Sequence, residues 1–113
     1  MKEKIAFEEF LQIEKKIEIK IGTVNSVEEV LKSNKLLKLE VSFGSDDIRQ
    51  VVTNIKPHLT NFKELEGKKF LFVTNLKAAT MMGIISEAMI LPGEIDKGHT
   101  IVSVSGIDGD IIL

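Results

Sequence analysis

The chain has 113 residues, with 15 Lys or Arg, 17 Asp or Glu and no cysteine, and its formal net charge is −2. This length suits one domain with a single core, residues 1–113. The absence of cysteine excludes disulfides and thiolate metal sites, and no apolar run approaches the roughly 18 residues that a membrane span needs. Acidic residues interrupt the N-terminus where a signal peptide needs an apolar run, so we expect a cytoplasmic protein without a membrane partner.

Charge is distributed unevenly along the chain. Residues 32–77 carry nine Lys or Arg against five acidic residues, whereas residues 1–31 have a net charge of −2 and residues 78–113 of −4. Binding to nucleic acid through bulk charge needs clustered cations. Only the middle third of the chain could provide such a cluster.

The first third predicts one helix and one strand. Residues 5–13 space their apolar side chains as an amphipathic helix does, and we expect this helix to dock on the body of the protein. Residues 17–21 alternate apolar and charged side chains, which predicts a half-buried strand that continues through Val24. Gly22 lies inside this pattern and predicts a bulge or a sharp bend.

The middle of the chain predicts a hairpin and a helix. Residues 36–43 alternate, and four side chains are expected to face the core: Leu37, Leu39, Val41 and Phe43. Residues 44–47 have the composition of a tight turn into a partner strand over 48–53, in which Val51 and Val52 leave the inner face undecided. Pro57 then opens a segment, 58–65, that predicts a short helix ending at Gly67.

The last third predicts two further strands and an extension. Residues 70–73 form an apolar strand, a polar loop runs from Asn75 to Gly83, and a second strand ends at Leu91. A turn is expected at 97–99, and the apolar C-terminal residues are expected to be covered, for example by a second subunit. Five strands with a helix between the third and fourth match the OB-fold. The predicted class is therefore all-β: a five-stranded OB-fold barrel with an interposed short helix, an N-terminal helix and a C-terminal β extension.

No residue pattern indicates catalysis, a metal site or a cofactor. His58 and His99 lie beside turn residues without a carboxylate or nucleophile at an informative spacing, so we interpret them as solvated loop residues. With no Trp or Tyr, an aromatic stacking platform for single strands is not expected. Recognition of a folded RNA by shape and backbone remains open.

Several motifs, in order and spacing, resemble the tRNA-binding domain that occurs free-standing or appended to methionyl-tRNA synthetases. The motifs are the Phe7–Phe10 entry segment, Ser33–Val41, Arg49–Ile55, Leu65–Lys69, and Asn75-Leu76-Lys77 followed by Gly83-Ile84 and Ser86-x-x-Met89. The resemblance implies a non-catalytic OB-fold protein that forms a homodimer, binds tRNA without strong sequence preference and aids an aminoacyl-tRNA synthetase, most plausibly the methionyl enzyme. The RNA-binding positions that it implies are Asn34, Lys35, Lys38, Asn54, Lys77, Ser86 and Met89.

One departure from the family pattern is visible. The family usually has proline and further basic residues after Asn-Leu-Lys, whereas Ala78-Ala79-Thr80 follows here. Fewer phosphate contacts would weaken binding several-fold at moderate salt. Ser86 and Met89 are three residues apart, so they act together only if a bulge or turn separates them.

Three alternatives stay open at this point. The CsaA-type chaperones are relatives that bind peptides, and the apolar segment around Met81 and Met82 suits a peptide groove. The chain could also be a docking module that tethers a synthetase. Finally, Lys35 and Lys38 could be ordinary solvated lysines, and the methionines could simply fill gaps in the core.

Overall fold

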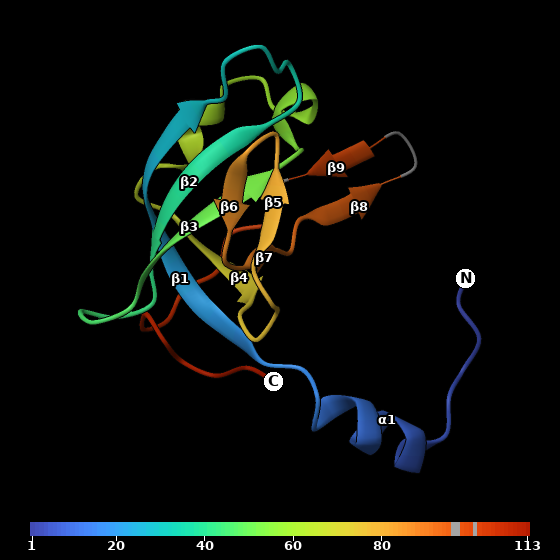
Figure 1. Cartoon of the computed structure of the whole chain (residues 1–113). Coiled ribbons are helices and arrows are strands. Elements are labelled where there is room, and N and C mark those ends of the chain that lie inside the picture. The colour runs from blue at the N-terminus through green and yellow to red at the C-terminus, as the bar shows by residue number, and fades with distance from the viewer. Residues whose placement is uncertain (96–97, 101) are drawn as a thin grey trace.

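The computed structural model describes residues 1–95, 98–100 and 102–113, and the side chains of residues 1–93 and 102–113. Five strands form one antiparallel sheet in the order β3-β2-β1-β4-β7, and this sheet curls into a nearly closed barrel (Figure 1). Two short hairpins, β5–β6 and β8–β9, are added to it. The strands are β1 (Ile19–Glu29), β2 (Leu37–Ser42), β3 (Ile48–Thr53), β4 (Lys69–Val73), β5 (Ala79–Met81), β6 (Ile84–Ser86), β7 (Met89–Ile90), β8 (Gly93–Ile95) and β9 (Gly98–Thr100).

The predicted all-β barrel is confirmed, and β2 shows why its alternation was informative. The four inward side chains predicted for this segment, from Leu37 to Phe43, are at most 4% exposed. The undecided pair in β3 is explained by the fold, because Val51 and Val52 are both buried. One side of β3 faces the barrel interior, and β6 and β7 lie against the strand as well.

Gly22 does not form a bulge, contrary to the expectation. It pairs regularly with Phe70 of β4, and a Cβ atom at this position would lie 2.7 Å from a ring carbon of Phe43 and from a methyl carbon of Val41. The glycine is therefore needed for close packing across the barrel. The irregularity of β1 occurs further along, between Val24 and Ser26.

The connection between β3 and β4 contains two 3₁₀ turns rather than the one helix expected over 58–65. The first is η1 (Lys56–His58), with Pro57 in its opening turn, and the second is η2 (Phe62–Leu65). Asn61 has an extended backbone between them and accepts a hydrogen bond from the Lys63 backbone N–H, 3.1 Å away. This cap begins a new turn in place of continuing the first.

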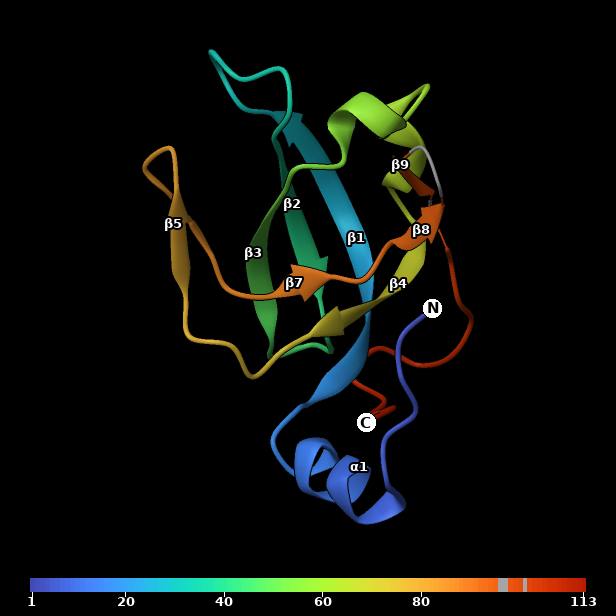
Figure 2. The same cartoon turned by 90° about the vertical axis from the view of Figure 1, so that its right-hand side faces the viewer.

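The helix α1 (Phe7–Glu14) is present where expected but does not dock on the barrel. None of its residues is buried, and it lies beyond the start of β1 in both views (Figures 1 and 2). No helix among the described residues has the length and apolarity that crossing a membrane requires.

The C-terminal backbone is held against β1, but the apolar side chains of this segment are not covered as expected. The Ile19 N–H donates to the Leu113 carbonyl, 2.7 Å away, and the Ile112 N–H donates to the Ile19 carbonyl, 2.8 Å away. The side chains of Ile111 and Ile112 remain 66% and 54% exposed. The expected turn at 97–99 begins at a residue outside those described.

Candidate functional site

A groove lies beside the seam where β3 approaches the strands that close the barrel. Its volume is about 470 Å³. We call it the seam groove; it is lined by Leu36, Val52, Thr53, Asn54, Ile55, Met81, Met89, Ile90, Leu91 and Pro92. A smaller cavity of about 180 Å³, here the side pocket, shares Val52, Met81 and Met89 with it and adds Leu76, Lys77, Ala79, Ser86 and Ala88.

The β5–β6 hairpin forms one wall of the groove. Its turn residues, Met82 and Gly83, both have positive φ, 49° and 80°, which suits the twist of a two-residue hairpin loop. The strand β5 pairs only with β6 among the described strands, and all three of its residues are exposed. The hairpin therefore stands at the edge of the barrel (Figure 2) and presents Met81 to the groove.

Side chains, more than backbone pairing, close the seam beneath the groove. The Val52 N–H donates to the Ser86 hydroxyl, 2.9 Å away, and this hydroxyl donates to the Ala88 carbonyl at 3.0 Å. The Gln50 N–H donates to the Glu87 carboxylate at 3.1 Å, and the Glu87 N–H donates back to the Gln50 carbonyl at 2.8 Å. The side chains of Ser86 and Glu87 thus accept hydrogen bonds from two backbone N–H groups of β3 that a regular neighbouring strand would pair.

These bonds revise the role expected for Ser86. Its side chain lies in the side pocket, but Ser86 is only 5% exposed and its hydroxyl makes two internal hydrogen bonds. Because the hydroxyl already donates one hydrogen bond and accepts another inside the barrel, it has little capacity left to bind RNA by hydrogen bonding. Glu87 and Ala88 separate Ser86 from Met89, so the turn needed to bring both to one cavity is present.

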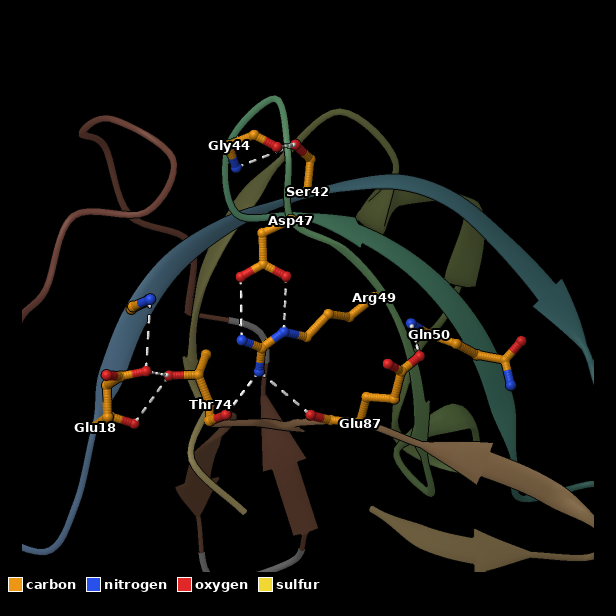
Figure 3. A network of polar contacts seen from close by, with 9 residues as sticks. Glu18, Ser42, Gly44, Asp47, Arg49, Gln50, Thr74 and Glu87 are labelled. Atoms are coloured by element: carbon orange, nitrogen blue, oxygen red, sulfur yellow. Dashed lines mark hydrogen bonds and ion pairs between the residues drawn. The ribbon is translucent and has the colours of Figure 1, made fainter. Parts of the chain in front are cut away.

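Arg49 joins three segments next to the seam (Figure 3). Its Nε and Nη2 atoms donate to the two carboxylate oxygens of Asp47, 2.9 and 3.1 Å away, and its Nη1 atom donates to the Thr74 carbonyl at 2.6 Å. The guanidinium carbon lies 5.3 Å from the centre of the Phe43 ring. The hydrogen bonds from Arg49 lower the pKa of Asp47 below its usual range, as a charge-assisted bidentate pair does.

The loop that leaves β4 is fixed by a second set of bonds. The Thr74 hydroxyl donates to the Glu18 carboxylate at 2.6 Å, and this hydrogen bond is the main cause of a lowered Glu18 pKa. Asn75 donates to the Lys16 carbonyl and accepts from the Glu18 N–H, both at 2.8 Å. The loop thus starts from a rigid position, and the exposed Lys77 follows two residues later.

The seam groove and the side pocket differ in charge from two other cavities of the molecule. Among the residues that the structure describes, no acidic side chain lines the seam groove or the side pocket, and Lys77 is the one charged residue there. The neighbouring cavities, by contrast, are lined by glutamates such as Glu28, Glu40 and Glu87. The chain has a net charge of −2 but has no carboxylate in the lining of the seam groove or the side pocket, as is also true of a third cavity lined by Lys68 and Lys69.

The basic middle third is largely neutralised inside the fold. Five of its nine cations form ion pairs of 2.9–3.5 Å: Lys38, Arg49, Lys56, Lys63 and Lys69. No ion pair joins the remaining four to another described residue: Lys32, Lys35, Lys68 and Lys77. Lys32 and Lys35 lie in the β1–β2 loop, next to the Leu36 end of the groove, and Lys77 lies in the side pocket.

The seven predicted site residues fall into two groups. Four line the two cavities: Asn54, Lys77, Ser86 and Met89. Three lie beyond the Leu36 end: the exposed Asn34 and Lys35, and Lys38, whose ammonium is paired with Glu28 at 3.2 Å. The contact of any of them with RNA stays a prediction.

From the sequence, Met81 is connected with a peptide groove but is not among the expected RNA-binding positions, and the anchoring role of Arg49 was missed. Met81 is 37% exposed and lines both cavities, and the adjacent Met82-Gly83 pair was the available signal for a hairpin that exposes it. Arg49 was noticed only within a motif. No local pattern shows that its partners include Thr74, which is 25 residues away.

Comparison with known proteins agrees with this architecture. Residues 19–111 match the family described as "Putative tRNA binding domain". The methionine–tRNA ligase of Methanocaldococcus jannaschii is 44% identical over 96 residues, which are 85% of this chain but 14% of that protein. The chain thus spans about a seventh of this relative's length.

Two crystal structures have the same fold along nearly the whole chain. A MetRS related protein from Pyrococcus horikoshii superposes with a TM-score of 0.84 at 33% identity, covering 99% of this chain and 100% of the other. A CsaA chaperone protein from Picrophilus torridus superposes with a TM-score of 0.80 at 25% identity, covering 97% and 100%. The family match extends over most of the sequence, and the chain therefore belongs to the tRNA-binding domain family and is related to part of the methionyl-tRNA synthetases.

Proposed function

We propose that this protein binds tRNA across the seam groove and the β1–β2 loop, mainly through shape and phosphate contacts. The observation that carries the proposal is the acid-free lining of the seam groove and the side pocket. Lys32 and Lys35, beyond one end of the groove, and Lys77, in the side pocket, make no ion pair with a described residue. A polyanion is repelled by carboxylates and attracted by lysines that no internal ion pair uses. This surface satisfies both conditions.

The bound tRNA serves an aminoacyl-tRNA synthetase, the methionyl enzyme, and the protein has no reaction of its own. The support is the relationship to methionine–tRNA ligases, of which this chain matches only a small share. A domain of this kind adds affinity for tRNA to a synthetase that carries or recruits it. The setting is the cytoplasm, where tRNA is charged.

The functional unit is a homodimer. The apolar side of α1 is exposed at Phe7, Phe10 and Ile13, which are 70%, 39% and 40% accessible, and Ile111 and Ile112 are exposed as well. The C-terminus and α1 lie at the same end of the barrel (Figure 2). Two-fold pairing would cover both segments at once. A dimer also places two seam grooves on one particle, which raises the apparent affinity for one large RNA.

The test is fluorescence anisotropy with total tRNA over a range of salt concentrations. Lys35→Ala and Lys77→Ala should each weaken binding to about the same extent for different tRNAs, because phosphate contacts carry no sequence information. Each should reduce the slope of log K against log salt by roughly one counterion. Lys68→Ala is the matched control, since it also removes an unpaired lysine but one that lines neither cavity. Equal losses in all three variants would contradict the assignment of the surface.

A second function is favoured by a different observation. The lining of the seam groove is mostly apolar, and the outer edge of β5 has no partner strand among the described residues. An extended peptide can add to such an edge and place side chains into an adjacent groove, and the CsaA chaperone has the same fold. Competition decides between the two: an unstructured peptide that binds with little salt dependence, while tRNA does not bind, would favour the peptide.

A further inference from the structure

We propose that an unpaired RNA base enters the seam groove between Met81 and Met89, with Asn54 at its polar edge and its phosphate near Lys77. This inference rests on the proposed binding of tRNA and specifies how the groove takes part in it. In this arrangement the groove holds an RNA base, whereas the β1–β2 loop contacts only the RNA backbone.

The two methionines make the groove suitable for a flat aromatic ring. Met81 comes from β5 and Met89 from β7, and both line the seam groove and the side pocket. Both are accessible, at 37% and 48% exposed. The polarizable thioether makes favourable contacts with aromatic rings, and its flexible chain adapts to a ring inserted beside it.

The protein offers no aromatic side chain of its own at this place. It has six Phe and no Tyr or Trp, and none of the Phe lines either cavity among the described residues. A base that leaves its stack therefore finds aliphatic and thioether surface in place of an aromatic platform. The volume of about 470 Å³ lies in the usual range of small-ligand sites, so it suits one base and not a folded helix.

The polar groups at the groove suit a nucleotide better than an aromatic peptide side chain. Asn54 is exposed, and its carboxamide makes no hydrogen bond with another described residue. A carboxamide has both donors and an acceptor, as hydrogen bonding to a base edge requires. The adjoining side pocket, which shares Met81 and Met89 with the groove, adds Lys77, and this is the one charged residue that lines either cavity. A base with its phosphate matches both groups, whereas a phenylalanine side chain matches neither.

The base must be unpaired to reach these groups. In an A-form helix the base edges of the major groove are out of reach of side chains, and sequence-specific contacts to RNA are made to unstacked bases in loops and ends. Transfer RNA has such bases in its loops and at its single-stranded 3′ end. The structure therefore assigns to the groove a loop or end nucleotide rather than a base pair.

The methyl resonances of the methionines provide the experiment. The protein, labelled with ¹³C at the methionine methyl groups, is titrated with total tRNA, with oligo(A) RNA, with AMP and with ribose 5-phosphate. Insertion of a base predicts upfield ring-current shifts at Met81 and Met89 with tRNA, oligo(A) and AMP, and none with ribose 5-phosphate. Met82 is the matched control, because it is 60% exposed on the same hairpin but lines neither cavity.

Asn54→Ala tests the polar edge without endangering the fold, since this side chain is exposed. We expect binding of oligo(A) to weaken by about two- to tenfold, the usual effect of one hydrogen bond, with an unchanged salt slope. If tRNA binds with its salt dependence while Met81 and Met89 shift no more than Met82, the inference fails and the proposed function stands. If no RNA binds, both fail. Shifts at these methionines with N-acetyl-phenylalaninamide but not with AMP or RNA would overturn the inference in favour of a peptide.

Discussion

Replacement of Arg49 by alanine should destabilise the protein more than the removal of any exposed cation. The side chain of Arg49 is 21% exposed, and its removal leaves the Thr74 carbonyl, in a residue only 5% exposed, without the donor 2.6 Å away. An unsatisfied buried carbonyl costs about 1–3 kcal/mol. The half-exposed pair with Asp47 adds about 0–1 kcal/mol, and the contact with the Phe43 ring adds about 0.5–1 kcal/mol.

The sum is a loss of about 1.5–5 kcal/mol in the free energy of unfolding, which for a domain of this size lowers Tm by about 4 °C per kcal/mol. Thermal unfolding followed by circular dichroism should therefore show a Tm about 6–20 °C lower than that of the wild type. Lys38→Ala is the matched control: it breaks an exposed ion pair with Glu28 and should lower Tm by less than about 4 °C. If the Tm values of Arg49→Ala and Lys38→Ala differ by less than about 2 °C, loss of the donor to the buried Thr74 carbonyl does not destabilise the protein as expected.

The remaining predictions concern packing, pH, the seam and assembly. Gly22→Ala should cost about 1–3 kcal/mol in urea unfolding, because the added methyl would lie 2.7 Å from two core side chains; equal or higher stability would contradict it. The free energy of unfolding should fall as the pH drops through the ordinary pKa values of Glu18 and Asp47, 4.5 and 3.8. The fold lowers the pKa of both carboxyl groups, so the unfolded chain takes up protons at a higher pH than the folded protein does. A free energy of unfolding that stays constant from about pH 6 to about pH 3, the range in which carboxylates titrate, would refute this prediction. Ser86→Ala should destabilise the barrel by about 1–3 kcal/mol, because a buried backbone N–H loses its acceptor, while the salt slope of tRNA binding should not change. Sedimentation should show a dimer at tens of micromolar, on the order of the affinity of a moderate interface, and Phe10→Asp should shift it to monomer; a monomeric wild type would rule the dimer out.

The barrel could be predicted from the sequence because its strands alternate and its turns are marked. The alternation from Leu37 to Phe43 correctly identified which side chains of β2 and of the residue after it point into the core. It could do so because one face of the strand contacts the core and the other contacts solvent. The tRNA-binding family was also identifiable, because its motifs occur in order along the chain. The resemblance covered residues 5–91 and the family match covers residues 19–111, so the two share residues 19–91.

The groove could not be predicted because it is a tertiary feature. Its walls come from β3, from a hairpin that the sequence presented as a loop, and from β7, so no local window contains it. The ion pairs of the basic middle third could not be predicted for the same reason. The sequence shows nine cations in the middle third, but only the fold shows that Lys38 and Lys56 pair with Glu28 and Glu29 of β1 and that Lys77 does not.

Glycine positions were ambiguous for a related reason. Gly22 and Gly83 both interrupt apolar runs, but the first is required by a ring that packs against it and the second by a positive φ of 80° in a turn. A single glycine in a strand pattern is compatible with either cause. The choice depends on Phe43, which approaches from another strand.

Binding of tRNA by the wild-type protein can be decided by measuring its affinity for total tRNA as a function of salt, beside its affinity for an unstructured apolar peptide. We predict that log K for tRNA falls linearly with log salt, with a slope that corresponds to about three phosphate contacts at roughly −0.7 to −0.9 each, from Lys32, Lys35 and Lys77. We also predict that the peptide binds more weakly and with almost no dependence on salt. Absence of salt-dependent tRNA binding, together with tight binding of the peptide, would contradict the claim that this acid-free surface is an RNA-binding site.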